Sequence, residues 1–122
     1  MPKFASNDMI DGSLAVVAGA TRMVAIAGQP ASYAAAEAGK LVQVPLASGD
    51  FAIAPGDVSG RKVSVAAKAS LPVFAAGTAD HIALLDVAGS RLLYVTTCPS
   101  QALVAGGLVR IAGWSIEIGA PV

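Results

Sequence analysis

The spacing of hydrophobic residues is helical at the start of the chain and becomes strand-like over the rest. Residues 6–20 place Ile10 and Leu14 on one face of a helix, and Ser6 or Asn7 can cap its first turn. The pattern therefore predicts one short N-terminal helix. The first seven residues of the chain follow no regular pattern, and we expect residues 1–7 to form a flexible N-terminal arm.

Apolar runs and turn residues predict strands over most of the remaining chain. Residues 23–27 are apolar on both faces, which indicates a strand in the centre of a sheet. Residues 41–46 form a second strand, with Pro45 near its end or on a sheet edge, and the Ala-rich stretch 32–38 between them favours a helical turn. After residue 47 turn signals recur at short intervals, which is typical of an all-β sandwich or barrel.

Two hairpins are expected in the second half. Residues 81–86 and 91–97 flank a four-residue loop, and residues 108–111 and 114–118 flank Ala112–Gly113. The sequence thus predicts one domain spanning residues 1–122, mainly β, with a β-sandwich or barrel-like architecture and one short N-terminal helix.

Composition points to association with other proteins. Hydrophobic residues make up 55% of the chain and charged residues only 13%, about half the usual share of about 25%. Eight basic and eight acidic residues cancel, so no strong field attracts nucleic acid or an anionic membrane. No secretion signal or membrane span is expected, because acidic residues precede the first apolar run and the longest uncharged stretch contains turn residues.

Reactive side chains are few and dispersed. A catalytic site would have to use His81 with Asp80 or Asp86, but regular strand alternation turns both carboxylates away from the imidazole. Cys98 has no nearby basic residue to lower its pKa, so we expect a buried, inert thiol. One His and one Cys cannot form a tetrahedral metal site. The sequence therefore predicts a protein that is not an enzyme and has no cofactor or metal.

Several segments together resemble small virion structural proteins of tailed bacteriophages. The resemblance covers most of the chain and is carried by Gln29–Tyr33, Gly49–Phe51, Ser59–Val63, Gly77–Leu84, Leu93–Cys98 and Trp114–Ile118. Within that group it implies a capsid decoration or cement protein. Such a protein binds the outside of the capsid and stabilises it, and proteins of this kind are often β-rich trimers.

This resemblance and the composition lead to one functional hypothesis with two rivals. The expected partners are the major capsid protein and the chain itself, as a homotrimer, and the expected location is the capsid surface of a virion assembled in the host cytoplasm. The expected interface residues are Pro2, Lys3, Phe4, Met9 and Ile10. One alternative is a tail, baseplate or fibre structural protein, and the second is a small ligand-binding module or enzyme.

Overall fold

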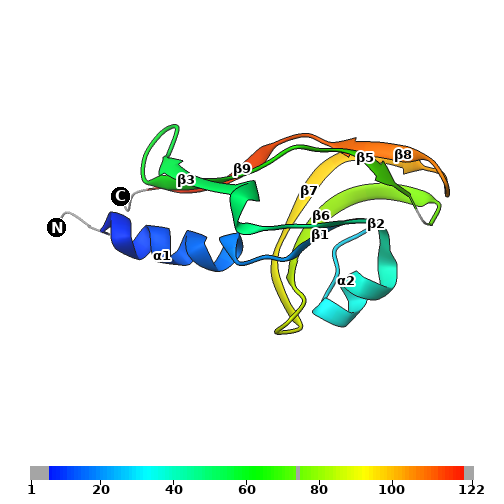
Figure 1. The fold of residues 1–122 in the computed structure, drawn as a ribbon, viewed down its shortest axis with the longest axis horizontal. Helices are drawn as coiled ribbons and strands as arrows, with labels where there is room; N and C mark the ends of the chain where they lie inside the picture. Colours follow the sequence, from blue (N-terminus) through cyan, green and yellow to red (C-terminus); the bar gives the residue numbers. More distant parts are fainter. Residues whose placement is uncertain (1–5, 74, 120–122) are drawn as a thin grey trace.

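The computed structural model describes residues 6–73 and 75–119, and these form a mainly β fold with two helices (Figure 1). This confirms the predicted fold class and its N-terminal helix. The elements in chain order are α1 (Asn7–Ala18), β1 (Arg22–Ile26), α2 (Tyr33–Gly39), β2 (Lys40–Pro45), η1 (Ser48–Asp50), β3 (Phe51–Pro55), β4 (Arg61–Val65), β5 (Lys68–Pro72), β6 (Gly77–Asp86), β7 (Arg91–Leu103), β8 (Leu108–Ile111) and β9 (Trp114–Ile118).

Helix α1 begins where the sequence provides a cap. The hydroxyl of Ser6 accepts a hydrogen bond from the backbone N–H of Met9 at 3.1 Å, which satisfies one of the donors left free at a helix start. On the face of α1 that is turned toward the sheet, Ile10 and Leu14 are buried against Val63 of β4. The predicted apolar face is therefore the face that fixes α1 onto the sheet.

The largest sheet has the strand order β2-β1-β6-β7, and all its pairs are antiparallel. Strand β1 lies between two neighbours and is almost entirely buried, as its apolar faces predicted. Strand β2 forms the edge and Pro45 is its last residue, where the missing N–H of proline removes no internal ladder bond. The predicted hairpin of β6 and β7 is also confirmed.

The second predicted hairpin is wrong, although the bounds of its strands are right. β9 pairs with β4 in the sheet β3-β4-β9, whereas β8 pairs with β5 in a separate two-stranded sheet. Residues 66–67 join β4 to β5 while Ala112–Gly113 join β8 to β9. The two connections lie beside each other, so the β4–β9 pair continues into the β5–β8 pair as one long two-stranded ribbon along one side of the molecule (Figure 1). Ala112–Gly113 therefore continues the strand direction and does not reverse it.

These sheets curl into an incomplete barrel. An antiparallel bridge between Val42 and Val73 places β5 beside β2, which extends the strand order to β7-β6-β1-β2-β5-β8. The buried side chains inside it include Met23, Val42 and Leu84. Among the described residues no backbone hydrogen bond joins β7 to β8. The barrel is therefore open along one seam, between its first and last strands.

Helix α2 covers the outer face of the large sheet. Its Ala36 is buried against Val24 of β1, and Glu37 accepts hydrogen bonds from Arg22 at 2.8 Å and from Lys40 at 3.0 Å. Burial acts to raise the pKa of Glu37, but the hydrogen bonds from these two cations outweigh it and the net pKa is lowered. The ion pairs thus hold α2 in place with the carboxylate charged.

Across the described ranges, no helix has the length and apolar character needed to cross a membrane.

Candidate functional site

The residues predicted to form an interface have different places in the structure. Pro2, Lys3 and Phe4 lie outside the described residues. Met9 projects from α1 with 61% of its surface exposed, which leaves it free to contact another molecule. Ile10 is only 3% exposed because it packs beneath α1 against Val63. We therefore correct its assignment: Ile10 is a core residue that fixes α1 on the sheet.

The histidine environment also differs from the expectation of regular strand alternation. The register of β6 against β7 shifts between Ala79 and His81, where Asp80 alone lies opposite residues 98–100, so the extra residues of the irregularity are on β7. At this irregularity the Asp80 carboxylate lies 2.7 Å from His81 Nδ1 and accepts a hydrogen bond from Gly28 N–H at 2.8 Å. The bonds with His81 and then Gly28 lower the pKa of Asp80. The prediction that Asp80 and His81 point apart was therefore wrong.

Cys98 does not have the environment of a nucleophile. It packs partly buried against the main core, and burial, followed by the charge of Asp80, raises the pKa of its thiol. A raised pKa disfavours the reactive thiolate. Within residues 6–73 and 75–119 no three His, Cys, Asp or Glu side chains converge to hold a metal ion.

The carboxylates of the Asp50 to Asp57 segment are engaged in ion pairs. Asp50 accepts from Lys68 at 2.7 Å and from Ala47 N–H at 2.8 Å, which ties the η1 turn to β5. Asp57 accepts from Lys62 at 2.6 Å in a more exposed position. Next to Lys62 on β4, Arg61 donates to Asp11 of α1 at 2.8 Å. The adjacent cations at 61 and 62 are thus both paired with carboxylates.

Asp50→Asn is expected to lower the free energy of unfolding at neutral pH by about 1 kcal/mol. The hydrogen bonds from Lys68 and Ala47 lower the folded-state pKa of Asp50. Its contribution is therefore fully present above the unfolded-state pKa of about 3.9 and is lost as the pH falls through the lower folded-state pKa. Urea denaturation over this acid range measures the effect.

The matched control for that measurement is Asp57→Asn. Its side chain is 74% exposed, so removing its ion pair with Lys62 should change the free energy of unfolding by less than about 0.5 kcal/mol. Equal losses in the two variants, or a loss in Asp50→Asn that persists in strong acid, would contradict the assigned role of the Asp50 carboxylate.

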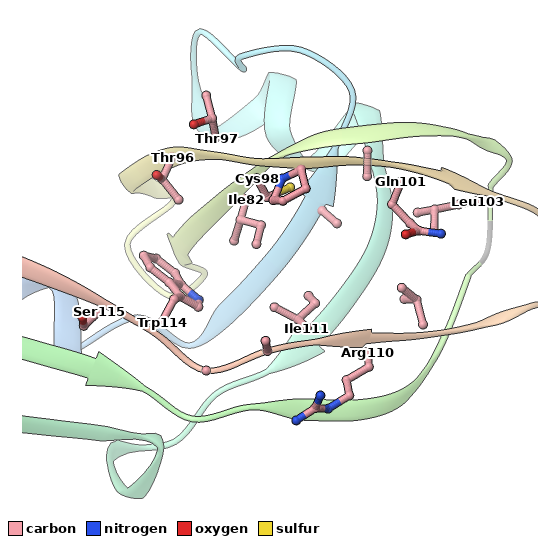
Figure 2. A pocket seen from close by; sticks show the side chains of 16 residues that line it. Ile82, Thr96, Thr97, Cys98, Gln101, Leu103, Arg110, Ile111, Trp114 and Ser115 are labelled. Atoms are coloured by element: carbon pink, nitrogen blue, oxygen red, sulfur yellow. The ribbon is translucent and has the colours of Figure 1, made fainter.

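A groove occupies the open seam of the barrel (Figure 2). Its volume is about 480 Å³, which lies in the range of ligand pockets. Residues 96–99, 101 and 103 of β7 line one side, residues 109–115 of the β8–β9 segment line the other, and Ile82 lies at the base between them. Much of the lining is apolar, and the charged guanidinium of Arg110 points away from the cavity (Figure 2).

The groove is bounded by strand edges as well as by side chains. In the described part of the chain β7 pairs only with β6, β8 only with β5 and β9 only with β4. Each of the three strands therefore leaves a row of backbone N–H and C=O groups without a strand partner. The turn after β7 is fixed by hydrogen bonds of Gly106 and Gly107 to Val73, so the two sides separate from that closed end.

Trp114 contributes an unusual polar group to the groove. Its ring stacks on Tyr94 with 6.1 Å between centroids and packs against the main core, which agrees with the alternation of apolar residues in β9. Its indole Nε1 is nevertheless buried without a hydrogen-bond partner among the described residues. An unsatisfied buried donor costs free energy, so a bound group whose acceptor atom reached this nitrogen would relieve that cost.

Sequence reasoning missed this groove for a physical reason. It depends on β7 and β8 being adjacent in the chain without pairing, and no local pattern reports such a separation. The one available signal was the tryptophan, an amphipathic residue on the same face of its strand as the aliphatic Ile116 and Ile118. Comparisons with protein-family models, with curated proteins and with solved structures found no match.

Proposed function

We propose that this protein is a structural component of a bacteriophage virion, a capsid decoration protein that binds the outside of the capsid and stabilises it without covalent bonds. The major capsid protein is its proposed partner, and the chain acts as a homotrimer at the capsid surface. The proposal combines the sequence resemblance with one structural observation, the positions of the exposed apolar side chains.

Exposed apolar side chains occur at both ends of the molecule. The loop between β3 and β4 carries Val58, which is 91% exposed, and β8 begins at Leu108, which is 71% exposed. The β3–β4 loop and the β7–β8 turn lie at opposite ends of the long axis (Figure 1). A protein with an apolar contact at each end is suited to bridging two neighbouring subunits of a lattice, and many weak contacts add up on a repeating surface.

Imaging of purified particles tests the proposal most directly. Hundreds of copies on the outside of the shell, the order of magnitude expected when avidity on a repeating lattice holds the protein, would support decoration. A handful of copies at the tail would reject it in favour of a tail, baseplate or fibre component. Density inside the shell would contradict both.

Val58→Asp is expected to reduce the amount of protein retained on particles by about tenfold, because a contact that desolvates this position would bury an unpaired charge. Quantifying bound protein after sedimentation of particles gives the measurement. Gln43→Glu adds the same charge at an exposed position of β2 and serves as the matched control. Equal retention of both variants would contradict a contact at the β3–β4 loop, and unchanged circular dichroism checks the fold.

A second candidate function is favoured by the groove. Its volume, its apolar lining and the unpartnered Trp114 Nε1 are features of a site for a small apolar ligand with one hydrogen-bond acceptor. Trp114 is the only tryptophan, so its fluorescence would report binding directly. Saturable quenching by such compounds, together with no retention on particles, would favour this ligand-binding module over decoration.

A further inference from the structure

We infer that the groove receives the N-terminal segment of a second copy of this chain, with residues 2–5 extended along the free edge of β7 and Phe4 packed against Trp114. The interaction is a strand addition, in which backbone hydrogen bonds give affinity and alternate side chains give specificity. The inference deepens the proposed function. It rests on that function only in that the copies meet at the capsid surface.

The groove has features that suit a peptide better than a hydrocarbon. The free edges of β7 and β8 offer unpaired backbone groups along its length, and an extended peptide carries matching donors and acceptors. The buried Nε1 of Trp114 has no acceptor among the described residues, and a backbone carbonyl of the added strand could supply one if the ring turns toward it. The apolar side chains between the edges, Ile82 and Leu103 among them, provide contacts for an inward-pointing aromatic ring.

The segment before Ser6 has a composition that fits this site. In an extended conformation Pro2 and Phe4 share one face, while Lys3 lies on the other. An inward Phe4 buries a large apolar surface, and the charge of Lys3 then remains in water. Five residues extend over at most about 17 Å, a length comparable to that of an ordinary strand.

The chain's own segment cannot occupy its own groove. Near the start of α1, Asp11 pairs with Arg61, and Arg61 is in register with Ile118 at the end of β9. From Ile118 to Trp114, against which Phe4 would pack, the strand runs four residues, or about 13 Å. Phe4 lies two residues before Ser6, a reach of at most about 7 Å, so it cannot contact Trp114 of its own chain. The occupant must therefore come from a neighbouring copy.

Disulfide trapping between two full-length chains tests the inference. One chain carries Pro2→Cys together with Cys98→Ser, and the other is the natural chain, whose only cysteine is Cys98. Each chain then has one thiol, and Cys98 lines the groove (Figure 2). Oxidation of the mixture at alkaline pH, chosen because burial raises the pKa of Cys98, should give a dimer linked from residue 2 to residue 98, identified by peptide mass mapping.

The matched control places the cysteine on the other face of the same segment. Lys3→Cys with Cys98→Ser should give at least about fivefold less of the heterologous link, because adjacent residues of a strand point to opposite sides. Similar yields from positions 2 and 3, or only homodimers linked between identical positions, would overturn the inference. If light scattering shows an oligomer under the same conditions while no link to residue 98 forms, this inference fails and the proposed capsid attachment is unaffected.

A second measurement keeps the inference testable without crosslinking. Phe4→Asp should raise the concentration at which the chain self-associates by at least about tenfold, and Phe4→Leu by less than about threefold, because leucine retains most of the buried apolar surface. Trp114 fluorescence and light scattering over a dilution series report the midpoint. If the natural chain remains monomeric at about 0.1 mM, its self-association is weaker than a specific interface requires, and the inference is overturned. Equal midpoints for both variants would also overturn it.

Discussion

Leu84→Ala is expected to lower the free energy of unfolding by about 2–5 kcal/mol. Leu84 is fully buried in β6, in the main core cluster inside the incomplete barrel. Its removal takes away apolar contacts and leaves a cavity that the hydrogen-bonded strands on either side cannot collapse to fill. Urea denaturation followed by circular dichroism measures the loss, and Trp114 fluorescence provides an independent probe of the same transition.

The matched control is Leu108→Ala, which removes the same atoms from a side chain that is largely exposed at the start of β8. This variant should change the free energy of unfolding by less than about 0.5 kcal/mol. A loss in Leu84→Ala below about 1 kcal/mol, or equal losses in the two variants, would show that the space between β6 and its neighbours is not the packed core of the fold.

Gly60→Ala is expected to cost about 3 kcal/mol, the second largest effect, for two reasons that act together. Gly60 has φ +69°, a left-handed conformation in which side chains with a Cβ are strained. An added Cβ would also overlap the carbonyl oxygen of Ile118, which lies on the neighbouring strand β9. Relief of the overlap requires β4 and β9 to move apart at the point where α1 packs on them.

Gly28→Ala separates these two causes. Gly28 has φ +76°, but a Cβ added there meets no atom of the described residues within 4 Å. This variant therefore carries only the cost of the backbone conformation, about 1–2 kcal/mol. Equal losses in Gly28→Ala and Gly60→Ala, measured by the same denaturation experiment, would mean that the contact with Ile118 contributes nothing.

The functional proposals make different demands on the same fold. Attachment to a lattice uses exposed side chains at its ends, such as Val58, whereas strand addition uses the groove between β7 and β8. A variant at the β3–β4 loop should therefore leave self-association unchanged, and a variant of Phe4 should leave a single-copy lattice contact unchanged. The two sets of experiments thus test separate surfaces of the chain.

Elements set by neighbouring residues were predicted correctly. The start of α1 follows from the Ser6 cap, and the central place of β1 follows from apolar residues on both of its faces. The place of Pro45 at the end of β2 follows from its missing N–H. In each case the physical cause lies within a few residues, so one stretch of sequence contains it.

Features that depend on two distant segments could not be predicted in this way. The pairing of β8 with β5 was missed because Ala112–Gly113 is equally compatible with a reversal and with a continued strand. The contact of Asp80 with His81 was missed because it lies where the register of β6 against β7 shifts. The groove was missed because it arises where two neighbouring strands fail to pair.

The sequence by itself determined helix α1 and its apolar side, the strands β1, β2, β8 and β9, and that little charge is available for the surface. Only the tertiary structure decided which strands pair, where the barrel stays open, and that Trp114 brings an unpartnered donor to that opening. The reason is that side-chain alternation fixes the face of a strand but not its partner. Backbone hydrogen bonds are nearly the same for any residue, so the partner is selected by packing of the whole core.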